Sequence, residues 1–215
     1  SLEYVKKKVP AEAAAKIKEL NLPGIGVVED SVRFYPNGSL AAHVLGFTGI
    51  DSQGLEGIEH SRDKELTGQP GSILTEYGAN GIKIPDAEHE FIPPIQGNTV
   101  KLTIDKNIQA FAERELAKLM AGQGTNMEGV VPKSASILVM EPSTGRMLAI
   151  ASTPTFDPNN YQASDPSTRR NIAIQNGYEP GSTFKIITLA AALEEKKVGL
   201  NDRFTDPGFT TILGK

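Results

Sequence analysis

"SILVMEPSTGRMLAIAS", from Ser136 to Ser152, predicts two strands joined by a turn. The runs Ser136–Met140 and Arg146–Ser152 flank Glu141–Gly145, whose Pro, Ser, Thr and Gly residues are typical of a turn. Both runs are apolar almost throughout, so we expect both faces of this hairpin to be covered. A polar loop follows, and an apolar helix is predicted from Ser182 onward. A hairpin, a long loop and a buried helix together indicate an α+β fold.

The segment before the hairpin changes its hydrophobic period from that of a strand to that of a helix. "TVKLTI" (Thr99–Ile104) alternates apolar and polar residues, as a half-buried strand does. From Asp105, a suitable N-cap, the apolar residues recur at helical spacing. We therefore expect a strand that leads directly into an amphipathic helix.

The N-terminal part predicts a series of short elements. Pro10–Leu20 predicts a helix, and Ser39–Gly46 predicts a short helix capped by Ser39 and stopped by Gly46. Ser72–Ile84 predicts two strands around a Gly-Ala-Asn-Gly turn, and Phe91–Asn98 predicts a loop.

Composition excludes several classes of function. The net charge is −4, and no basic run is longer than Lys6-Lys7-Lys8, which argues against a nucleic-acid partner. The absence of cysteine excludes disulfides, a thiol nucleophile and thiolate metal sites. The histidines are expected to be surface or packing residues, and no residue cluster implies a metal or organic cofactor. These histidines are His43, His60 and His89.

Two Ser-x-x-Lys patterns occur in the chain, and the pattern alone is weak evidence for catalysis. Ser61 and Lys64 lie among charged and polar neighbours, which indicates a solvated helix face. Ser182 instead follows Pro180 and Gly181 and begins an apolar helix, where free N–H groups favour an oxyanion. The spacing of three residues places Lys185 on the same helix face as Ser182.

Two interpretations of Ser182 and Lys185 stay open on these local grounds. A lysine one turn into a buried helix is costly to leave charged, and its neutral amine could take the serine proton. Alternatively, Ser182 is only an N-cap, and Lys185 extends along the helix to reach solvent.

The longer string around these residues resembles a known family. "YEPGSTFK", followed by an apolar helix, closely resembles the active-site segment of class B penicillin-binding proteins. Earlier segments resemble the N-terminal pedestal domain and the opening strands of the transpeptidase domain, in family order. They are Arg33–Gly49, Gly54–Gly71, Val100–Leu119 and Ser136–Tyr161. The resemblance implies a dimerisation-type pedestal domain at residues 1–131. The beginning of a transpeptidase domain of the penicillin-binding and serine β-lactamase type would follow at residues 132–215.

The resemblance also implies a function. Ser182 would be the nucleophile and Lys185 its general base in a peptidoglycan D,D-transpeptidase that serves sporulation or cell division. Stem peptides ending in D-Ala-D-Ala and β-lactams would acylate Ser182, whose backbone N–H would form part of the oxyanion hole. The expected partner is a membrane glycosyltransferase or another cell-wall synthesis protein. The expected location is the extracytoplasmic face of the cell membrane, reached through an N-terminal transmembrane helix missing from this chain.

The chain departs from the family pattern at both ends. It contains no Ser-x-Asn and no Lys-Thr-Gly motif, and only 33 residues follow Ser182. No run reaches the roughly 18 apolar residues of a membrane span. We therefore expect an incomplete fragment that is inactive by itself. Without the strand that carries Lys-Thr-Gly in the family, the helix from Ser182 to Lys197 is expected to lack much of its cover. The alternatives are a non-catalytic docking module for the cell-wall machinery and a serine β-lactamase or D,D-carboxypeptidase.

Overall fold

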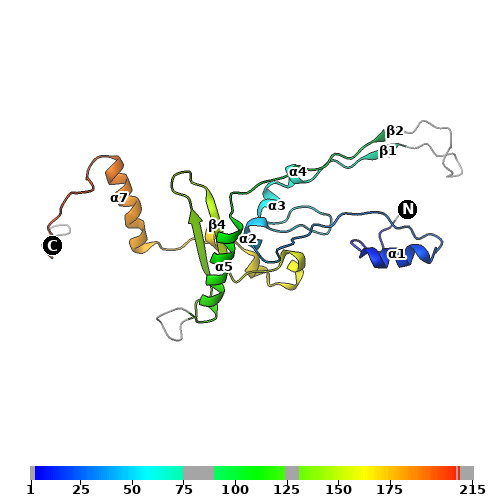
Figure 1. Ribbon diagram of the computed structural model, residues 1–215, viewed down its shortest axis with the longest axis horizontal. Coiled ribbons are helices and arrows are strands. Elements are labelled where there is room, and N and C mark those ends of the chain that lie inside the picture. Colours follow the sequence, from blue (N-terminus) through cyan, green and yellow to red (C-terminus); the bar gives the residue numbers. More distant parts are fainter. Residues whose placement is uncertain (1–2, 75–89, 124–130, 207, 209–215) are drawn as a thin grey trace. The chain divides into compact units, whose positions relative to one another are not determined.

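The computed structural model describes residues 3–74, 90–123, 131–206 and 208, and its elements are labelled in Figure 1. The chain divides into two compact units, Ser1–Asn176 and Gly177–Lys215. The first unit contains α1 (Ala11–Glu19), α2 (Ala42–Leu45), α3 (Gly57–Ser61), α4 (Asp63–Leu66), β1 (Ser72–Leu74), β2 (Glu90–Ile92), α5 (Lys106–Met120), β3 (Ala135–Met140), β4 (Met147–Thr153), the 3₁₀ turns η1 (Pro158–Ala163) and η2 (Pro166–Arg169), and α6 (Ile172–Gln175). The second contains η3 (Gly181–Phe184) and α7 (Lys185–Glu194). This mixture of helices and antiparallel strands confirms the α+β fold class.

The hairpin β3–β4 and helix α5 form the main hydrophobic core of the first unit (Figure 1). The strands form the antiparallel hairpin that the sequence predicted, and the structure sets its register, with Ile137 opposite Ala151 and Val139 opposite Ala149. Helix α5 packs against one face of this pair. The buried residues of this core are Ala112, Leu116, Ala149 and Ala151.

On the other face of the hairpin, two apolar residues of β3 are exposed. Leu138 is 50% exposed and Met140 is 55% exposed. The expectation that both faces are covered is therefore wrong for these residues. An apolar run shows that a strand can be buried on both faces, but the layer that covers the second face must come from another element. No described element covers Leu138 and Met140.

Helix α5 begins where the sequence predicted. The Asp105 carboxylate accepts hydrogen bonds from the backbone N–H groups of Asn107 (2.8 Å) and Ile108 (3.0 Å), which satisfies donors that the first helical turn leaves free. The preceding segment, Thr99–Ile104, is not a strand, which corrects the prediction. It lies at the end of β4, where the Thr103 hydroxyl donates to the Met147 carbonyl (2.6 Å), but it forms no ladder with a described strand.

The side chain of Gln109 fastens α5 to the outer edge of β4. Its amide nitrogen donates to the Ile150 carbonyl (2.9 Å), and its amide oxygen accepts from the Ile150 N–H (2.8 Å). The same nitrogen also donates to the Glu113 carboxylate (2.8 Å). Gln109 is only 1% exposed, and it supplies β4 with the hydrogen bonds that a neighbouring strand would otherwise make.

The short N-terminal elements follow the sequence in part. Helix α1 lies within the predicted range, and Gly46, with φ 78°, ends α2 as expected. Ser39 is not the cap of α2. The residue before this helix is Ala41, in the left-handed region with φ 56°, and its N–H donates to the Glu113 carboxylate (2.7 Å). A contact from α5, distant in sequence, thus sets the start of α2.

Strand β1 lies within Ser72–Ile84, where the sequence predicted two strands around a turn. Its partner is β2 (Glu90–Ile92), which places Phe91 and Ile92 in a strand where a loop was expected. The predicted Gly-Ala-Asn-Gly turn lies outside the described residues. The pairing is antiparallel, with Ser72 opposite Ile92, so the connection is longer than the predicted turn.

Candidate active site

Ser182 and Lys185 lie at the start of the helical segment of the second unit. The 3₁₀ turn η3 contains Ser182 and continues directly into α7, whose first residue is Lys185. Pro180 has helical dihedrals, and Gly181, with φ 52°, makes the bend that leads into the turn. The Lys185 N–H donates to the Ser182 carbonyl, so the two residues are joined across one turn of backbone.

The 3₁₀ geometry places the two residues on one helix face. With three residues per turn, side chains three positions apart are eclipsed, which aligns them more closely than an α-helix does. The spacing in the sequence predicted this shared face. Both side chains are described, and the pair shares a face without a hydrogen bond between the Ser182 hydroxyl and the Lys185 amine.

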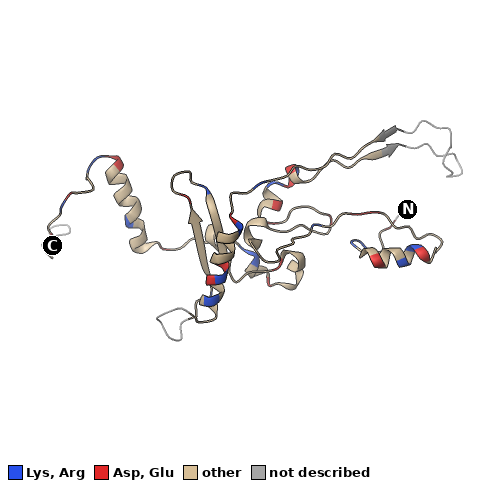
Figure 2. Ribbon diagram, in the orientation of Figure 1, with Lys and Arg blue, Asp and Glu red and all other residues tan. Residues whose placement is uncertain are grey.

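The helix that carries these residues is exposed. Its apolar pattern alone predicted a buried central helix, but much of the cover of this helix was expected to be missing from this chain. Ile186 is 71% exposed, Ile187 is 59% exposed and Leu189 is 55% exposed. No charged residue lies between Lys185 and Glu194, as Figure 2 shows for α7. A helix that is apolar on every face needs neighbours on every side to be buried. The described part of the second unit offers no second layer, so it does not provide the desolvation expected around Lys185.

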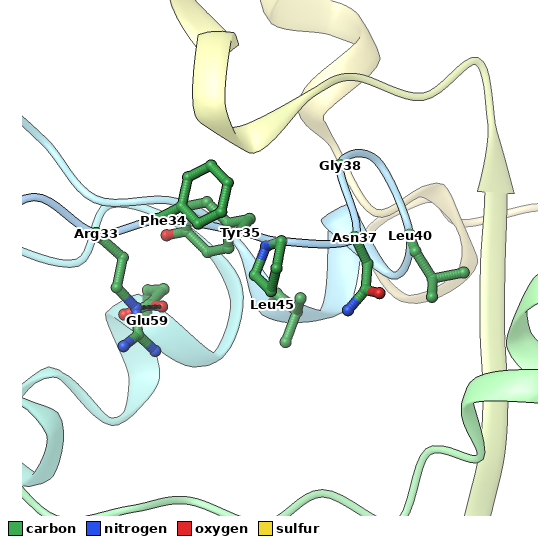
Figure 3. Close-up of a pocket in the computed structure, with 9 residues that line it drawn as sticks. Arg33, Phe34, Tyr35, Asn37, Gly38, Leu40, Leu45 and Glu59 are labelled. Atoms are coloured by element: carbon green, nitrogen blue, oxygen red, sulfur yellow. Dashed lines mark hydrogen bonds and ion pairs between the residues drawn. The ribbon is translucent and has the colours of Figure 1, made fainter.

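A cavity of about 200 Å³ lies in the first unit, and Figure 3 shows its walls. Arg33 donates to the buried Glu59 carboxylate (2.7 Å) beside this cavity. Burial raises the pKa of Tyr35 to about 12, with a smaller effect of Glu59 in the same direction and an opposing one of Arg33. Tyr35 therefore stays protonated near neutral pH and is no candidate base. Sequence reasoning missed the Arg33–Glu59 pair because no short spacing links residues 26 positions apart.

The histidines that the structure describes agree with their expected roles. His43 is buried at 8% exposure and packs against Phe156, and His60 is exposed. His89 lies outside the described residues. Burial is the largest influence on the pKa of His43 and lowers it, against opposing effects of the Thr168 carbonyl, Glu113 and Glu56. The second Ser-x-x-Lys pattern, Ser61 to Lys64, spans the exposed boundary between α3 and α4.

Comparison with known proteins assigns both parts of the chain to one family. The "Penicillin-binding Protein dimerisation domain" matches residues 3–102, and the "Penicillin binding protein transpeptidase domain" matches residues 135–212, which include Ser182 and Lys185. The chain therefore belongs to the class B penicillin-binding proteins, with a dimerisation domain followed by the start of a transpeptidase domain.

Individual relatives agree with this assignment. The chain is 46% identical to stage V sporulation protein D of Bacillus subtilis (strain 168), over 97% of this chain and 31% of that protein. It is 37% identical to the peptidoglycan D,D-transpeptidase FtsI of Escherichia coli (strain K12), over 92% of this chain and 32% of that protein. A solved peptidoglycan synthetase from Bifidobacterium adolescentis is 29% identical with a TM-score of 0.72, covering 98% of this chain and 37% of the other. The chain thus spans about a third of the length of the curated relatives it matches.

Proposed function

We propose that this chain is part of a peptidoglycan D,D-transpeptidase of bacterial cell-wall synthesis, with Ser182 as the acylated nucleophile and Lys185 as its general base. The observation that supports the proposal most directly is their position. They lie one helical turn apart, on one face, within the segment that matches the transpeptidase domain. A relative that is 37% identical is named a peptidoglycan D,D-transpeptidase.

The proposed acylation follows the Ser–Lys scheme. The neutral amine of Lys185 takes the hydroxyl proton as the Ser182 oxygen attacks the penultimate carbonyl of a D-Ala-D-Ala stem peptide. The tetrahedral intermediate collapses, its C–N bond breaks, and the proton passes to the departing D-Ala nitrogen. The acyl group is then held as an ester on Ser182. The backbone N–H of Ser182 would donate to the developing oxyanion.

The second half of the reaction transfers the acyl group. The amine of a neighbouring stem peptide attacks the ester carbonyl, the bond to the Ser182 oxygen breaks, and the serine recovers a proton that the amine gives up. The product is a peptide crosslink. A β-lactam would acylate the same oxygen by ring opening, and the ring nitrogen would take the proton. Because the ring nitrogen stays tethered, the acyl-enzyme would persist.

Intact-mass spectrometry with benzylpenicillin tests the proposal on the full-length gene product and on the 215-residue chain. We expect one stable adduct on the full-length product, its loss in Ser182→Ala, and slow formation in Lys185→Met. Ser61→Ala and Lys64→Met are matched controls from the second Ser-x-x-Lys pattern and should acylate normally. An adduct that persists in Ser182→Ala would refute the assignment. An adduct on the 215-residue chain would contradict its expected inactivity.

We propose further that the dimerisation-domain region docks a membrane glycosyltransferase or another cell-wall synthesis protein on the extracytoplasmic face of the membrane. The relationship to a stage V sporulation protein and to a peptidoglycan D,D-transpeptidase supports this role. No helix in the described ranges is long and apolar enough to cross a membrane. Membrane flotation of the full-length product should place it with lipid. A product that stays with the soluble fraction would contradict the proposed location at the membrane.

A further inference from the structure

Residues 35–47, matched by the dimerisation domain, and residues 156–171, matched by the transpeptidase domain, meet in the first unit around an aromatic junction. We define this junction as His43, Phe47, Phe156 and Tyr161. Phe47 stacks on Tyr161, with ring centroids 4.1 Å apart, and meets Phe156 edge to face at 5.7 Å. His43 meets Phe156 edge to face at 5.4 Å. The junction thus joins two parts of the chain that lie more than 100 residues apart in sequence.

Hydrogen bonds beside the junction also join residues 35–47 to residues 156–171. The Tyr35 N–H donates to the Asn159 side-chain oxygen, and the Asn159 side-chain nitrogen donates to the Tyr35 carbonyl, both at 2.9 Å. The Nε2 atom of His43 lies 2.8 Å from the Thr168 carbonyl oxygen. A carbonyl can only accept, so Nε2 carries the hydrogen and the neutral ring leaves Nδ1 unprotonated.

The charges around His43 come from three elements, and they oppose one another. Glu113 of α5 and Glu56 before α3 both favour the imidazolium. The Glu113 carboxylate accepts hydrogen bonds from the Ala41 N–H and from the Gln109 side chain. It therefore places negative charge near His43 without a hydrogen bond between the two side chains. On the side of the transpeptidase-matched residues, Arg169 of η2 lies over the Phe47 and Tyr161 rings at 5.8 Å and adds positive charge.

We propose that this junction is a pH-sensitive coupling between the dimerisation-domain region and the transpeptidase region, closed while His43 is neutral and loosened when Nδ1 takes a proton from solvent. Protonation would place a charge among aromatic rings, where desolvation is costly. The proposal does not depend on the chemistry of Ser182.

The direction of the effect follows from the lowered pKa of His43. In the opened or unfolded chain, His43 has the ordinary histidine pKa of about 6.5. His43 therefore binds a proton more readily there than in the closed junction. Closure is therefore unaffected well above about pH 6.5 and weakens as the pH falls below it. The equilibrium constant for opening should rise by up to about tenfold for each pKa unit that separates the two states.

Hydrogen exchange of the intact chain at about pH 8 and about pH 5, corrected for the intrinsic exchange rates, tests this. We expect peptides covering residues 35–47 and 156–171 to lose protection several-fold at the lower pH, while peptides from β3 stay unchanged. His43→Gln keeps an N–H donor but does not titrate, so its protection should not depend on pH. His60→Gln, at an exposed histidine, should behave as the wild type. An equal pH response in His43→Gln, or none in the wild type, would overturn the proposal.

Nuclear magnetic resonance titration of the histidine rings in the unaltered chain supplies a test that needs no variant. The His43 resonances should titrate below the ordinary histidine pKa of about 6.5, and signals from residues 156–171 should shift with the same midpoint. A His43 midpoint at or above about pH 6.5 would overturn the proposal. So would a lowered midpoint with no accompanying change in residues 156–171.

Discussion

Replacing Gln109 by methionine should destabilise the first unit strongly, although methionine has a similar size and is apolar. Gln109 satisfies both the N–H and the carbonyl of Ile150 at the outer edge of β4, at 2.8 and 2.9 Å. Methionine would leave both groups beneath α5 without partners, and each unsatisfied buried group costs about 1–3 kcal/mol. Ile150 is only partly buried, and methionine regains some apolar burial, so we expect a net loss of about 2–4 kcal/mol.

The free energy of unfolding would be measured by urea titration, followed by far-ultraviolet circular dichroism. Lys106→Met is the matched control, because Lys106 is an exposed residue of the same helix. It should stay within about 0.5 kcal/mol of the wild type. If Gln109→Met were as stable as this control, the edge of β4 would not depend on the amide. The conclusion that Gln109 replaces a neighbouring strand would then be wrong.

Substitutions at two further sites, each with a matched comparison variant, test the N-terminal part. Gly46→Ala should cost more than about 3 kcal/mol, because φ is 78° and an added Cβ would lie 1.8 Å from a neighbouring backbone carbonyl oxygen. Gly24→Ala, with φ 81° but open space around it, should cost only about 1 kcal/mol, and equal thermal shifts for the two would contradict the clash. Arg33→Met should cost about 1–3 kcal/mol by urea titration, since it leaves the Glu59 carboxylate buried without its partner, although Arg33 is half exposed. Adding Glu59→Gln should restore most of that loss, and a double variant no more stable than Arg33→Met would argue against the ion pair.

The candidate site was predictable from the sequence in its local features only. Ser182 and Lys185 are three residues apart at a helix start, so their shared face depends on backbone geometry that neighbouring residues determine. The exposure of α7 does not contradict its apolar pattern, because that pattern requires neighbours for burial but does not supply them. The division after residue 131 stays a prediction, as do the catalytic roles of Ser182 and Lys185.

The sequence by itself determined the elements whose signals are local. Asp105 starts α5, Gly46 ends α2, and the turn between Met140 and Met147 closes the β3–β4 hairpin, because caps, dihedral preferences and hydrophobic period act within a few residues.

Only the tertiary structure decided which distant residues meet. It paired Ser72 with Ile92, and it left Thr99–Ile104 without a ladder. It also brought His43 within hydrogen-bond distance of Thr168, 125 residues further along the chain. A strand's alternation shows which face is apolar but not which strand lies beside it, and a histidine's neighbours in sequence do not show what will surround its ring. Pairing, burial and the pKa of His43 therefore depend on packing between segments that no short stretch of sequence contains.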